Sequence, residues 1–591
     1  MKSFDTQGAA AVIRLDDFSG LCSESKAKNA AAAKVLRNLR HTKGGGSLSR
    51  REAITAIATL PSSIRGAVFD RQDGEELIFA AAGDSIYVIE RAQDGTHTMT
   101  LIGQMQTSDG DVDFFRVGEA LILMDGSSMY RLQRTTAQTV VPYIPLYGDG
   151  WNAADFGTVI QERNILTDRV HIRYVTDMTA YNLPLNIRAT QVNEVYQDGV
   201  LLSPELYSLD TSANALRLVN LTREGTVMDV ILTLQEDTDA LAMREDFYRC
   251  RCAVRPGEAN RSTVLLGGGN ECSVLYLTEQ IEVADRERCA QYAPEAVMLY
   301  LKANGRMEIG DGVHGIRAMV RHYDRTLLMS ESGTWTTDER RLAARAEQNP
   351  FLAVNSTIGC STFGGALTVG NAPISVCGGR LYRWGADTDE LDECNATPIS
   401  GEIERLVPAT LLRDGRLLYH AARDEIWVCR PDRADLVWVY QRDGQHWTAF
   451  DFGAAAPVAL FAMEGQVGLC SGDTLYCTDE AALCDTLRGG TAQPIRCEYC
   501  SHSLSFGHTG TRMRPYAAML CIGADTGQTV QMQAITAGGR TGQTVFRATG
   551  EQPCELIGHM ICGRCAHVNL RVVCESVGAF ELHAVAIAAT R

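Results

Sequence analysis

The feature that most limits the fold of this chain is a hairpin-like segment that recurs seven times. Each copy has an apolar run, a turn rich in Gly, Asp or Ser, and a second short run that contains an aromatic residue. Apolar runs around a polar turn predict a β-hairpin. The copies lie at 75–90, 119–133, 262–279, 325–338, 372–385, 415–430 and 465–479, and their aromatic residues are Tyr87, Tyr130, Tyr276, Trp335, Tyr382, Trp427 and Tyr476.

The spacing of these aromatic residues is typical of a β-propeller. All intervals but one are about 43 to 59 residues, close to the roughly 40 to 50 residues of one propeller blade. The interval between Tyr130 and Tyr276 is longer by about 100 residues, which predicts a domain inserted after the second repeat. The sequence therefore predicts an all-β protein: a six- or seven-bladed β-propeller with an inserted β-sandwich and a C-terminal β-sandwich.

Changes in pattern divide the chain into five segments. Residues 1–50 are poorly patterned and predict an N-terminal arm that can dock on a neighbouring subunit. This arm has an Ala-rich helical piece at 27–40 and a flexible, basic junction, GGGSLSRRE, at 44–52. The other segments are a first stretch of propeller at 51–149, the inserted β-sandwich at 150–236, a second stretch of propeller at 237–490 and the C-terminal β-sandwich at 491–591.

Charge and hydropathy exclude several classes of protein. The net charge of −17 argues against a protein that grips phosphates, although it is compatible with DNA that slides past an acidic wall. No apolar stretch approaches the ~20 residues of a membrane span. The first residues carry charges where an export signal needs an unbroken apolar core. We therefore expect a protein that is made in a cytoplasm and has no membrane span.

The nineteen cysteines predict reduced core residues rather than a disulfide framework. They are scattered along the chain, and many lie in strand-like runs, as do Cys272, Cys377, Cys429, Cys477 and Cys521.

A weak zinc candidate is the set Cys497, Cys500, Cys562 and Cys565, with His502, His559 and His567 nearby. Zinc ribbons usually separate their two CxxC pairs by about 15 to 20 residues, whereas here about 60 residues intervene. The sequence therefore favours cysteines that pack in strands, and predicts no metal site.

A search for catalytic and cofactor-binding residues finds none. The glycines at 267–269 lack the Lys and Ser or Thr of a phosphate loop and lie between two strands, so they indicate a turn. The Asp-Gly segments at 108–111 and 149–150 lack the further oxygen ligands that calcium requires. Paired carboxylates such as Glu75 and Glu76 are too common on solvated turns to identify a glycosidase. We expect a protein that is not an enzyme and has no cofactor.

Several segments, in order along the chain, resemble a family of tailed-bacteriophage β-propeller tail proteins, known as tail nozzle, tail hub or packaged-DNA stabilisation proteins. They are the glycine-rich link and first blade from 44 to 89, Tyr143 to Pro145 with Asn164 to Thr167, the blades at 264–279 and 310–337, Asn355 to Cys360 with the following hairpin, and YCSHSLSFGHTGTRMRP at 499–515. The chain departs from the family pattern in its basic first link, which no proline follows, and in its many cysteines.

The resemblance implies a structural virion protein. Such proteins form a ring, commonly a hexamer, below the portal and adaptor, and the ring retains and conducts double-stranded DNA without reading its sequence. The implied partners are other copies of the chain, the portal-adaptor and tail fibre proteins, and the implied location is the virion tail, after assembly in the host bacterial cytoplasm. Neighbours in a ring meet through two different faces. An acidic lumen would repel DNA, although the charge can equally serve only solubility.

Two alternatives remain open. The first is a baseplate or fibre-attachment protein of a long-tailed phage, because the segment at 192–210 resembles small sandwiches found where fibres attach. The second is a glycan-binding β-propeller, which would use exposed aromatic residues and convergent carboxylates. The recurrence of the seven aromatic residues at one hairpin position favours packing between blades instead.

Overall fold

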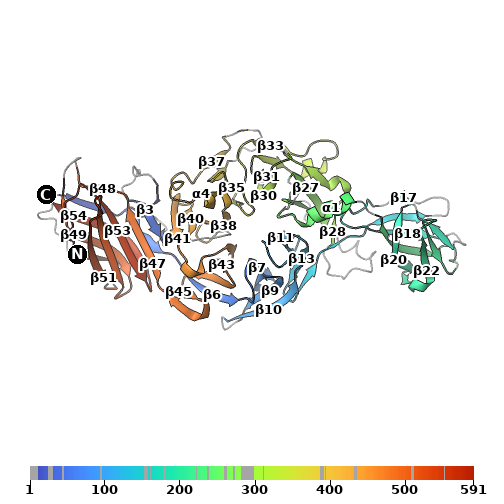
Figure 1. Ribbon diagram of the computed structural model, residues 1–591, viewed down its shortest axis with the longest axis horizontal. Helices are drawn as coiled ribbons and strands as arrows, with labels where there is room; N and C mark the ends of the chain where they lie inside the picture. The colour runs from blue at the N-terminus through green and yellow to red at the C-terminus, as the bar shows by residue number, and fades with distance from the viewer. Residues whose placement is uncertain are drawn as a thin grey trace. The chain divides into compact units, whose positions relative to one another are not determined.

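A computed structural model describes residues 11–23, 31–42, 46–92, 96–151, 158–159, 161–176, 181–185, 187–220, 222–235, 238–257, 263–269, 273–280, 298–310, 312–385, 392, 394–430, 436–507, 512–550 and 553–591. The described chain is almost entirely β-structure (Figure 1). It forms two compact units. Unit 1 holds the described residues of 1–101, 358–387 and 393–591, and unit 2 holds those of 102–357 together with Asp392.

Unit 1 contains four antiparallel sheets in which strands follow one another as meanders. The first contains β7 (Ile64–Gln72), β8 (Glu75–Ala82), β9 (Ser85–Arg91) and β10 (His97–Gln104). The second contains β34 (Ala366–Val369), β35 (Ala372–Cys377), β36 (Arg380–Trp384) and β37 (Ala396–Pro398). The third contains β38 (Arg416–His420), β39 (Glu425–Cys429), β40 (Val437–Gln441) and β41 (His446–Phe450).

The fourth of these sheets joins strands that are far apart in the sequence. Its meander of β42 (Ala459–Ala462), β43 (Val467–Ser471) and β44 (Thr474–Asp479) is completed by β6 (Ala53–Thr59). The register runs from Thr474 opposite Thr59 to Asp479 opposite Ala53. Two short strands, β45 (Asp485–Leu487) and β46 (Thr491–Gln493), extend the sheet beyond β6. An early strand thus closes the last meander.

Unit 2 contains three further meanders. The first contains β11 (Asp113–Val117), β12 (Ala120–Met124), β13 (Met129–Gln133) and β14 (Thr136–Thr139). The second contains β25 (Cys252–Val254), β26 (Thr263–Gly267), β27 (Val274–Gln280) and β28 (Met298–Tyr300), with β15 (Val141–Pro142) paired to β28 and β29 (Arg306–Glu308) paired to β27. The third contains β30 (Ile316–His322), β31 (Arg325–Ser330), β32 (Thr334–Thr337) and β33 (Leu352–Asn355).

All seven predicted hairpins are confirmed as antiparallel strand pairs. Six of them are the second and third strands of their meanders. The hairpin at 415–430 differs, because it is formed by β38 and β39, the first and second strands of theirs. Trp427 therefore lies one strand earlier than the other six aromatic residues. The repeat in the sequence predicts that each of these segments forms a hairpin, but it does not predict which two strands of the meander that hairpin supplies.

The long interval between Tyr130 and Tyr276 contains two additional sheets. The larger sheet has the strand order β17 (Thr158–Val159), β16 (Leu146–Trp151), β18 (Arg169–Val175), β24 (Val227–Leu234), β20 (Ala189–Gln197) and β21 (Val200–Leu201). The smaller sheet has the order β19 (Asn182–Pro184), β23 (Ala215–Leu218) and β22 (Tyr207–Asp210). Apolar side chains of both sheets share one core. The first strand begins at Leu146, slightly before the predicted boundary at residue 150.

Helices are short and few in the described residues. They are α1 (Thr238–Tyr248), α3 (Glu339–Ala343) and α4 (Ala409–Asp414), with 3-10 turns η1 (Pro204–Leu206), η2 (Ala303–Gly305), η3 (Gly453–Ala455) and η4 (Arg488–Gly490). Among the helices that the structure describes, none has the length and hydropathy needed to span a bilayer.

The described strands nearest the two ends of the chain together build a further region of unit 1 (Figure 1). One sheet has the order β4 (Leu39–His41), β5 (Leu48–Arg50), β54 (Phe580–Thr590), β49 (Arg514–Ala524) and β52 (Cys554–His559), with β1 (Ala11–Leu15) also paired to β54. The other strands are β3 (Ala32–Arg37), β47 (Ile495–Ser501), β53 (His567–Ser576), β50 (Thr529–Thr536) and β51 (Thr541–Arg547), with β2 (Ser19–Leu21) and β48 (Leu504–Ser505) at their sides. They continue the sheet of the third meander, because β3 pairs with β41 at Arg37 and Ala449. We call these two sets of strands the terminal β-unit.

The predicted arm over residues 1–50 is therefore wrong for its described residues. β1 pairs with β54 along its whole length, and β3 pairs with β47. Apolar side chains of this segment lie in the same core as strands from beyond residue 491; they are Leu15, Phe18, Leu21, Leu36 and Leu39. The segment is an integral component of a sheet pair, not a free extension.

The Ala-rich helix predicted at 27–40 is also wrong where the structure describes the chain, while residues 27–30 lie outside the described residues. Residues 32–37 form β3, with Ala33 and Leu36 buried. Asn38 then takes a positive φ of 56°, which no helix tolerates in its interior. Helix propensity is a weak preference, and burial between strands outweighs it here.

Candidate functional site

The seven repeat aromatic residues serve packing more than recognition. Tyr276 and Trp427 are 0% and 1% exposed, and Tyr87, Tyr130 and Tyr476 are also buried. Trp427 packs edge-on against Phe450, and its indole N–H donates to Glu425. Trp335 and Tyr382 are partly exposed. A row of aromatic side chains open to a sugar is therefore not present at these positions.

The predicted zinc candidates do not converge. Cys497 and Cys500 lie three residues apart on β47, and side chains at that spacing point to opposite faces of a strand. Cys497 is 3.6 Å from the Asn38 carbonyl oxygen, and Cys562 is 3.9 Å from that of Ala534. Cys565 lies at an isolated bridge to Met513. Within the described ranges, no group of three or more His, Cys, Asp or Glu can hold a metal ion.

The nearby histidines have other roles. The His502 ring nitrogen lies 2.7 Å from the Cys22 carbonyl oxygen, while His559 and His567 are exposed.

The other cysteines named from the sequence lie where strand packing places them. Cys377 and Cys429 are buried on β35 and β39, and Cys477 and Cys521 are partly buried on β44 and β49. Burial raises the pKa of Cys429 to about 12 and is the largest cause of the raised pKa, about 11, of Cys477. A thiol with a raised pKa is a poor nucleophile and a poor metal ligand at neutral pH. Cys272 lies outside the described residues.

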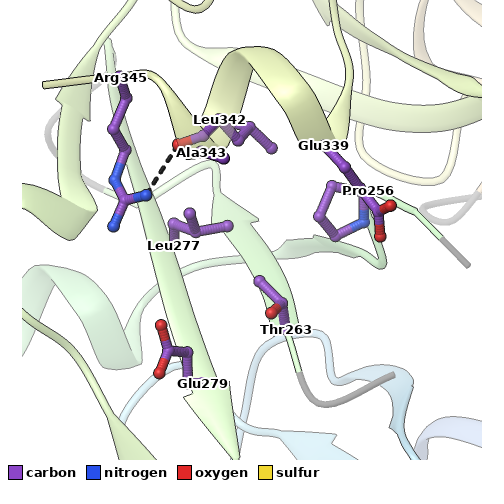
Figure 2. Close-up of a pocket in the computed structure, with 8 residues that line it drawn as sticks. All are labelled: Pro256, Thr263, Leu277, Glu279, Glu339, Leu342, Ala343 and Arg345. Carbon is purple, nitrogen blue, oxygen red and sulfur yellow. Dashed lines mark hydrogen bonds between the residues drawn. The ribbon is translucent and has the colours of Figure 1, made fainter. Parts of the chain in front are cut away.

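A cavity of about 320 Å³ in unit 2 is lined by Leu277 and Leu342, with carboxylates at its sides (Figure 2). Figure 2 shows the side chains of Glu279 and Glu339 on different sides of Thr263. The Arg345 guanidinium is already occupied, because it donates to the Leu342 and Asn304 carbonyl oxygens. Thr263 lies opposite Glu279 in the register of β26 and β27, so the lining combines a hydroxyl and two carboxylates with apolar walls.

A larger groove of about 940 Å³ in unit 1 lies between β2 and the turns of the neighbouring meanders. Its polar lining includes Arg383, Glu402 and His446, and Tyr440 and Trp384 form part of its wall. Burial raises the pKa of the Tyr440 phenol. The nearby Arg383 and Arg442 oppose this shift, and Glu402 adds to it. The groove mixes both signs of charge and shows no chemistry for a single reaction.

The most ordered group of polar side chains in unit 1 surrounds Arg51. This side chain is 2% exposed and forms a bidentate ion pair with Asp485, at 2.9 and 2.6 Å. Its Nε donates to Asn38, and its remaining donor bonds go to the carbonyl oxygens of Glu52 and Asp451. The guanidinium also lies 4.4 Å from the centre of the Phe452 ring. Arg51 thereby joins the start of β6, the loop after β41 and β45.

A second buried ionic group lies beside it. Arg40 on β4 is 3.3 Å from Glu52 and 3.4 Å from Glu425 on β39. Arg423 also pairs with Glu52, so two carboxylates face two guanidinium groups. Burial alone would raise the pKa of Glu425, but Arg40, with help from His420 and Trp427, holds it below its ordinary value. The ion pairs connect the terminal β-unit to the third meander of unit 1.

Two histidines stack at the same junction. The rings of His41 on β4 and His446 on β41 are 4.0 Å apart and nearly parallel. His41 contacts the Gln441 side-chain oxygen through Nδ1, and its Nε2 is buried without a hydrogen-bond partner. Burial, and then the neighbouring His446, lower the pKa of His41 to about 4. The stack is therefore neutral at neutral pH.

We expect this junction to weaken in acid. The unfolded imidazole of His41 binds a proton near pH 6.5 and the folded one only near pH 4, so the unfolded chain takes up protons first as the pH falls. Stability is then lost between about pH 6.5 and 4, by about 2 kcal/mol at pH 5. Glu425, whose folded pKa is lowered, adds a loss as the pH falls below its unfolded value.

Urea unfolding at pH 7 and pH 5 measures this effect. His41→Gln should reduce the difference between the two pH values, whereas His567→Gln, which changes an exposed histidine, should leave it unaltered. Equal pH dependence in the parent chain and in His41→Gln would show that His41 does not sense acid.

In unit 2, Asn164 holds the insertion to its meander. It is 1% exposed, and its amide nitrogen donates to the carbonyl oxygens of Tyr143 and Leu299, both at 2.8 Å. Its side-chain oxygen accepts from the N–H groups of Leu166 and Leu301. The segment after β15, the segment before β18 and the end of β28 thus meet at one side chain.

Asn164→Ala should destabilise unit 2 by about 3 kcal/mol, because it removes the Asn164 bonds of the Tyr143 carbonyl and of two buried N–H groups, while the Leu299 carbonyl keeps its bond from the Tyr143 N–H. Thermal or urea unfolding measures the change. Asn193→Ala, which removes a partly buried bond to Thr233, should cost less than about 1 kcal/mol. A loss below about 1 kcal/mol for Asn164→Ala would mean that water replaces these bonds and that the junction is not fixed.

Little in the sequence indicates these junctions. The RRE segment at 50–52 belongs to a predicted flexible basic junction, yet Arg51 and Glu52 are among the most buried charged side chains of unit 1. In the sequence, Asn164 is notable only because the segment Asn164 to Thr167 resembles the tail-protein family. In the described residues these groups connect segments that are more than a hundred residues apart in sequence, so they are joints of the fold.

No protein-family model matches this chain, and no curated protein matches it by sequence. Among solved structures, the chain is similar to PorZ, a bacterial surface component of the type-IX secretion system of Porphyromonas gingivalis, with 12% identity over 83% of this chain and a TM-score of 0.35. The match covers 46% of PorZ, so this chain spans less than half of that protein.

Two further solved structures are similar over most of their own length. The Pan2 WD40 domain of Neurospora crassa has 9% identity, covers 74% of this chain and 97% of its own, and gives a TM-score of 0.36. The Dos1 propeller has 9% identity, covers 73% of this chain and 96% of its own, and gives a TM-score of 0.33.

Proposed function

We propose that the seven meanders are the blades of one seven-bladed β-propeller. In this arrangement a β-sandwich interrupts the propeller after its second blade, and the terminal β-unit forms a second sandwich. The proposal is supported by the order of the sheets, which follow one another along the chain at blade-like intervals. It is also supported by β6, because a strand from before the first blade that completes the last one ties the two ends of such an array together.

We further propose that the chain is a non-enzymatic structural protein of a tailed bacteriophage. It would form a tail nozzle or hub ring below the portal-adaptor, where it retains and conducts DNA. The observation that carries this proposal is the ordered resemblance of segments from residue 44 to residue 515 to that family. Two of these segments take part in the buried joints around Arg51 and Asn164, which suit a component that must stay rigid under load.

A ring also fits what the described residues offer chemically. In the described part of unit 1, the buried Arg51 and Arg40 are paired with Asp485 and Glu52 and act as joints between strands. A conduit needs shape and rigid contacts between copies, and a ring closes when each copy presents two different faces to its neighbours. The terminal β-unit and the insertion provide surfaces beyond the blades for such contacts.

Negative-stain images of the purified full chain test the proposal. We expect closed rings or short tubes with a central channel. Single particles that bind sugars on a glycan array would support the glycan-binding alternative and contradict the nozzle. Rings that attach to fibre proteins but fail to bind a portal-adaptor complex would support the baseplate alternative.

A further inference from the structure

The two sheets of the terminal β-unit end side by side, at β51 and β52. The Thr544 hydroxyl donates to the His559 carbonyl oxygen across the gap between these strands. Glycines allow the approach, because a Cβ on Gly542 would lie 2.7 Å from the Ile561 carbonyl oxygen and one on Gly558 would lie 2.8 Å from Thr544. We call the outer edges of β51 and β52, with the adjoining Ile561, the rim.

The rim lacks two common protections of edge strands, a bulge and a proline. β51 and β52 are the last strands of their sheets among the described residues, so neither has a described partner on its outer side. Their registers with β50 and β49 run without a bulge, and neither strand contains Pro or Lys. Natural proteins normally use such features to prevent edge strands from pairing with other chains.

Apolar side chains are exposed along the same rim. Val545 on β51 is 61% exposed, Ile557 on β52 is 47% exposed and Ile561 is 78% exposed. Exposed apolar groups next to open strand edges mark an interaction site for another protein.

Charge indicates which protein fits. The rim is flanked by the exposed Arg540, Arg547 and Arg564, with Glu555 on β52. Residues 1–50 and 491–591, which include the described strands of the terminal β-unit, contain 17 Lys or Arg and 10 Asp or Glu, whereas residues 51–490 have a net charge of −24. The region of the chain that carries the rim is thus positive, and the rest of the chain is strongly negative. Complementary charge favours contact between these two regions of different copies.

We propose that the rim docks on the acidic segment, residues 51–490, of a second copy of this chain. The contact joins two different surfaces, so each copy can bind one neighbour through its rim and another through its acidic region. Such head-to-tail contacts generate a ring when the rotation between copies closes. This inference rests on the proposed self-assembly and identifies the surface that produces it.

Mass photometry of the full chain tests the inference. We expect Val545→Asp/Ile561→Asp to raise the concentration needed for assembly at least tenfold, because it places negative charge against an acidic surface. Val12→Asp/Val577→Asp changes two exposed apolar residues outside both the rim and the acidic segment, 43% and 54% exposed, and should assemble like the parent. If Val545→Asp/Ile561→Asp fails to fold, Arg540→Glu/Arg547→Glu tests the same contact through charge.

The outcomes separate this inference from the proposed function. Assembly by the parent and by both rim variants at equal concentration overturns the role of the rim but leaves self-assembly intact. Equal loss in the rim variant and in the Val12/Val577 control also overturns it. A parent chain that stays monomeric overturns both. A rim variant that assembles normally but loses affinity for duplex DNA overturns the inference in favour of a nucleic-acid contact.

Discussion

Deletion of residues 1–45 should unfold the terminal β-unit. The deletion removes the strands β1 to β4, and with them the partners of β54 and β47. It also removes Leu15, Phe18, Leu21, Leu36 and Leu39, each at most 3% exposed. At about 1.5 to 3 kcal/mol for each buried side chain, the loss is on the order of 10 kcal/mol, as large as the stability of a typical domain.

Limited proteolysis and near-UV circular dichroism of the truncated chain measure this effect. We expect rapid cleavage beyond residue 491, where the full chain is protected, and recovery of protection when a peptide of residues 11–50 is added. The prediction is contradicted if residues 495–590 of the truncated chain resist proteolysis as they do in the full chain. The terminal β-unit would then be stable without its first strands.

Arg51→Ala should destabilise unit 1 by about 3 to 5 kcal/mol. The change leaves Asp485, itself 4% exposed, as a buried carboxylate without its cation, and it removes the contact with the Phe452 ring. Asp485 would lose both hydrogen bonds from the Arg51 guanidinium and would keep the bond from the Ile54 N–H. Urea unfolding followed by tryptophan fluorescence measures the loss.

Three further variants give this measurement its controls. Arg51→Lys keeps the charge but not the planar fork, so we expect it to recover only part of the stability. Arg51→Met/Asp485→Leu should be less harmful than Arg51→Ala, because it removes both charges together. Arg14→Ala breaks an exposed pair with Asp16 and should cost less than about 1 kcal/mol. A loss below about 1 kcal/mol for Arg51→Ala would contradict a structural role for the pair.

The hairpins could be predicted because their causes are local. In the repeat at 75–90, the apolar residues of β8 and β9 surround a turn at Gly83, whose φ of 56° suits glycine. The strand pairs, the turns and the large interval for the insertion all follow from neighbouring residues. The hairpin at 415–430 is predictable for the same reason, although nothing local shows which strand of a meander it begins.

Long-range pairing could not be predicted in the same way. Strand β6 pairs with β44, about four hundred residues later, and β1 pairs with β54 near the other end of the chain. The Ala-rich segment at 32–37 favours a helix by propensity alone, and only its burial against β47 makes it a strand. Loop closure over such distances depends on the whole fold, and no local pattern records it.

The buried charges escape prediction for a related reason. Arg51 lies after a glycine-rich segment, and such a segment is typical of an exposed link. Its partner Asp485 is separated from it by 434 positions. A single sequence contains no signal for a pair of this kind, whereas the cysteine quartet forms a recognisable pattern whose members lie apart in the fold.

The number of copies in the assembled particle tests the central claim most directly. Native mass spectrometry of the purified full chain should give one dominant species near six times the chain mass of 64.4 kDa, and tandem dissociation should release single subunits. A dominant monomer at 64.4 kDa across micromolar concentrations and at low salt would contradict a ring-forming structural protein.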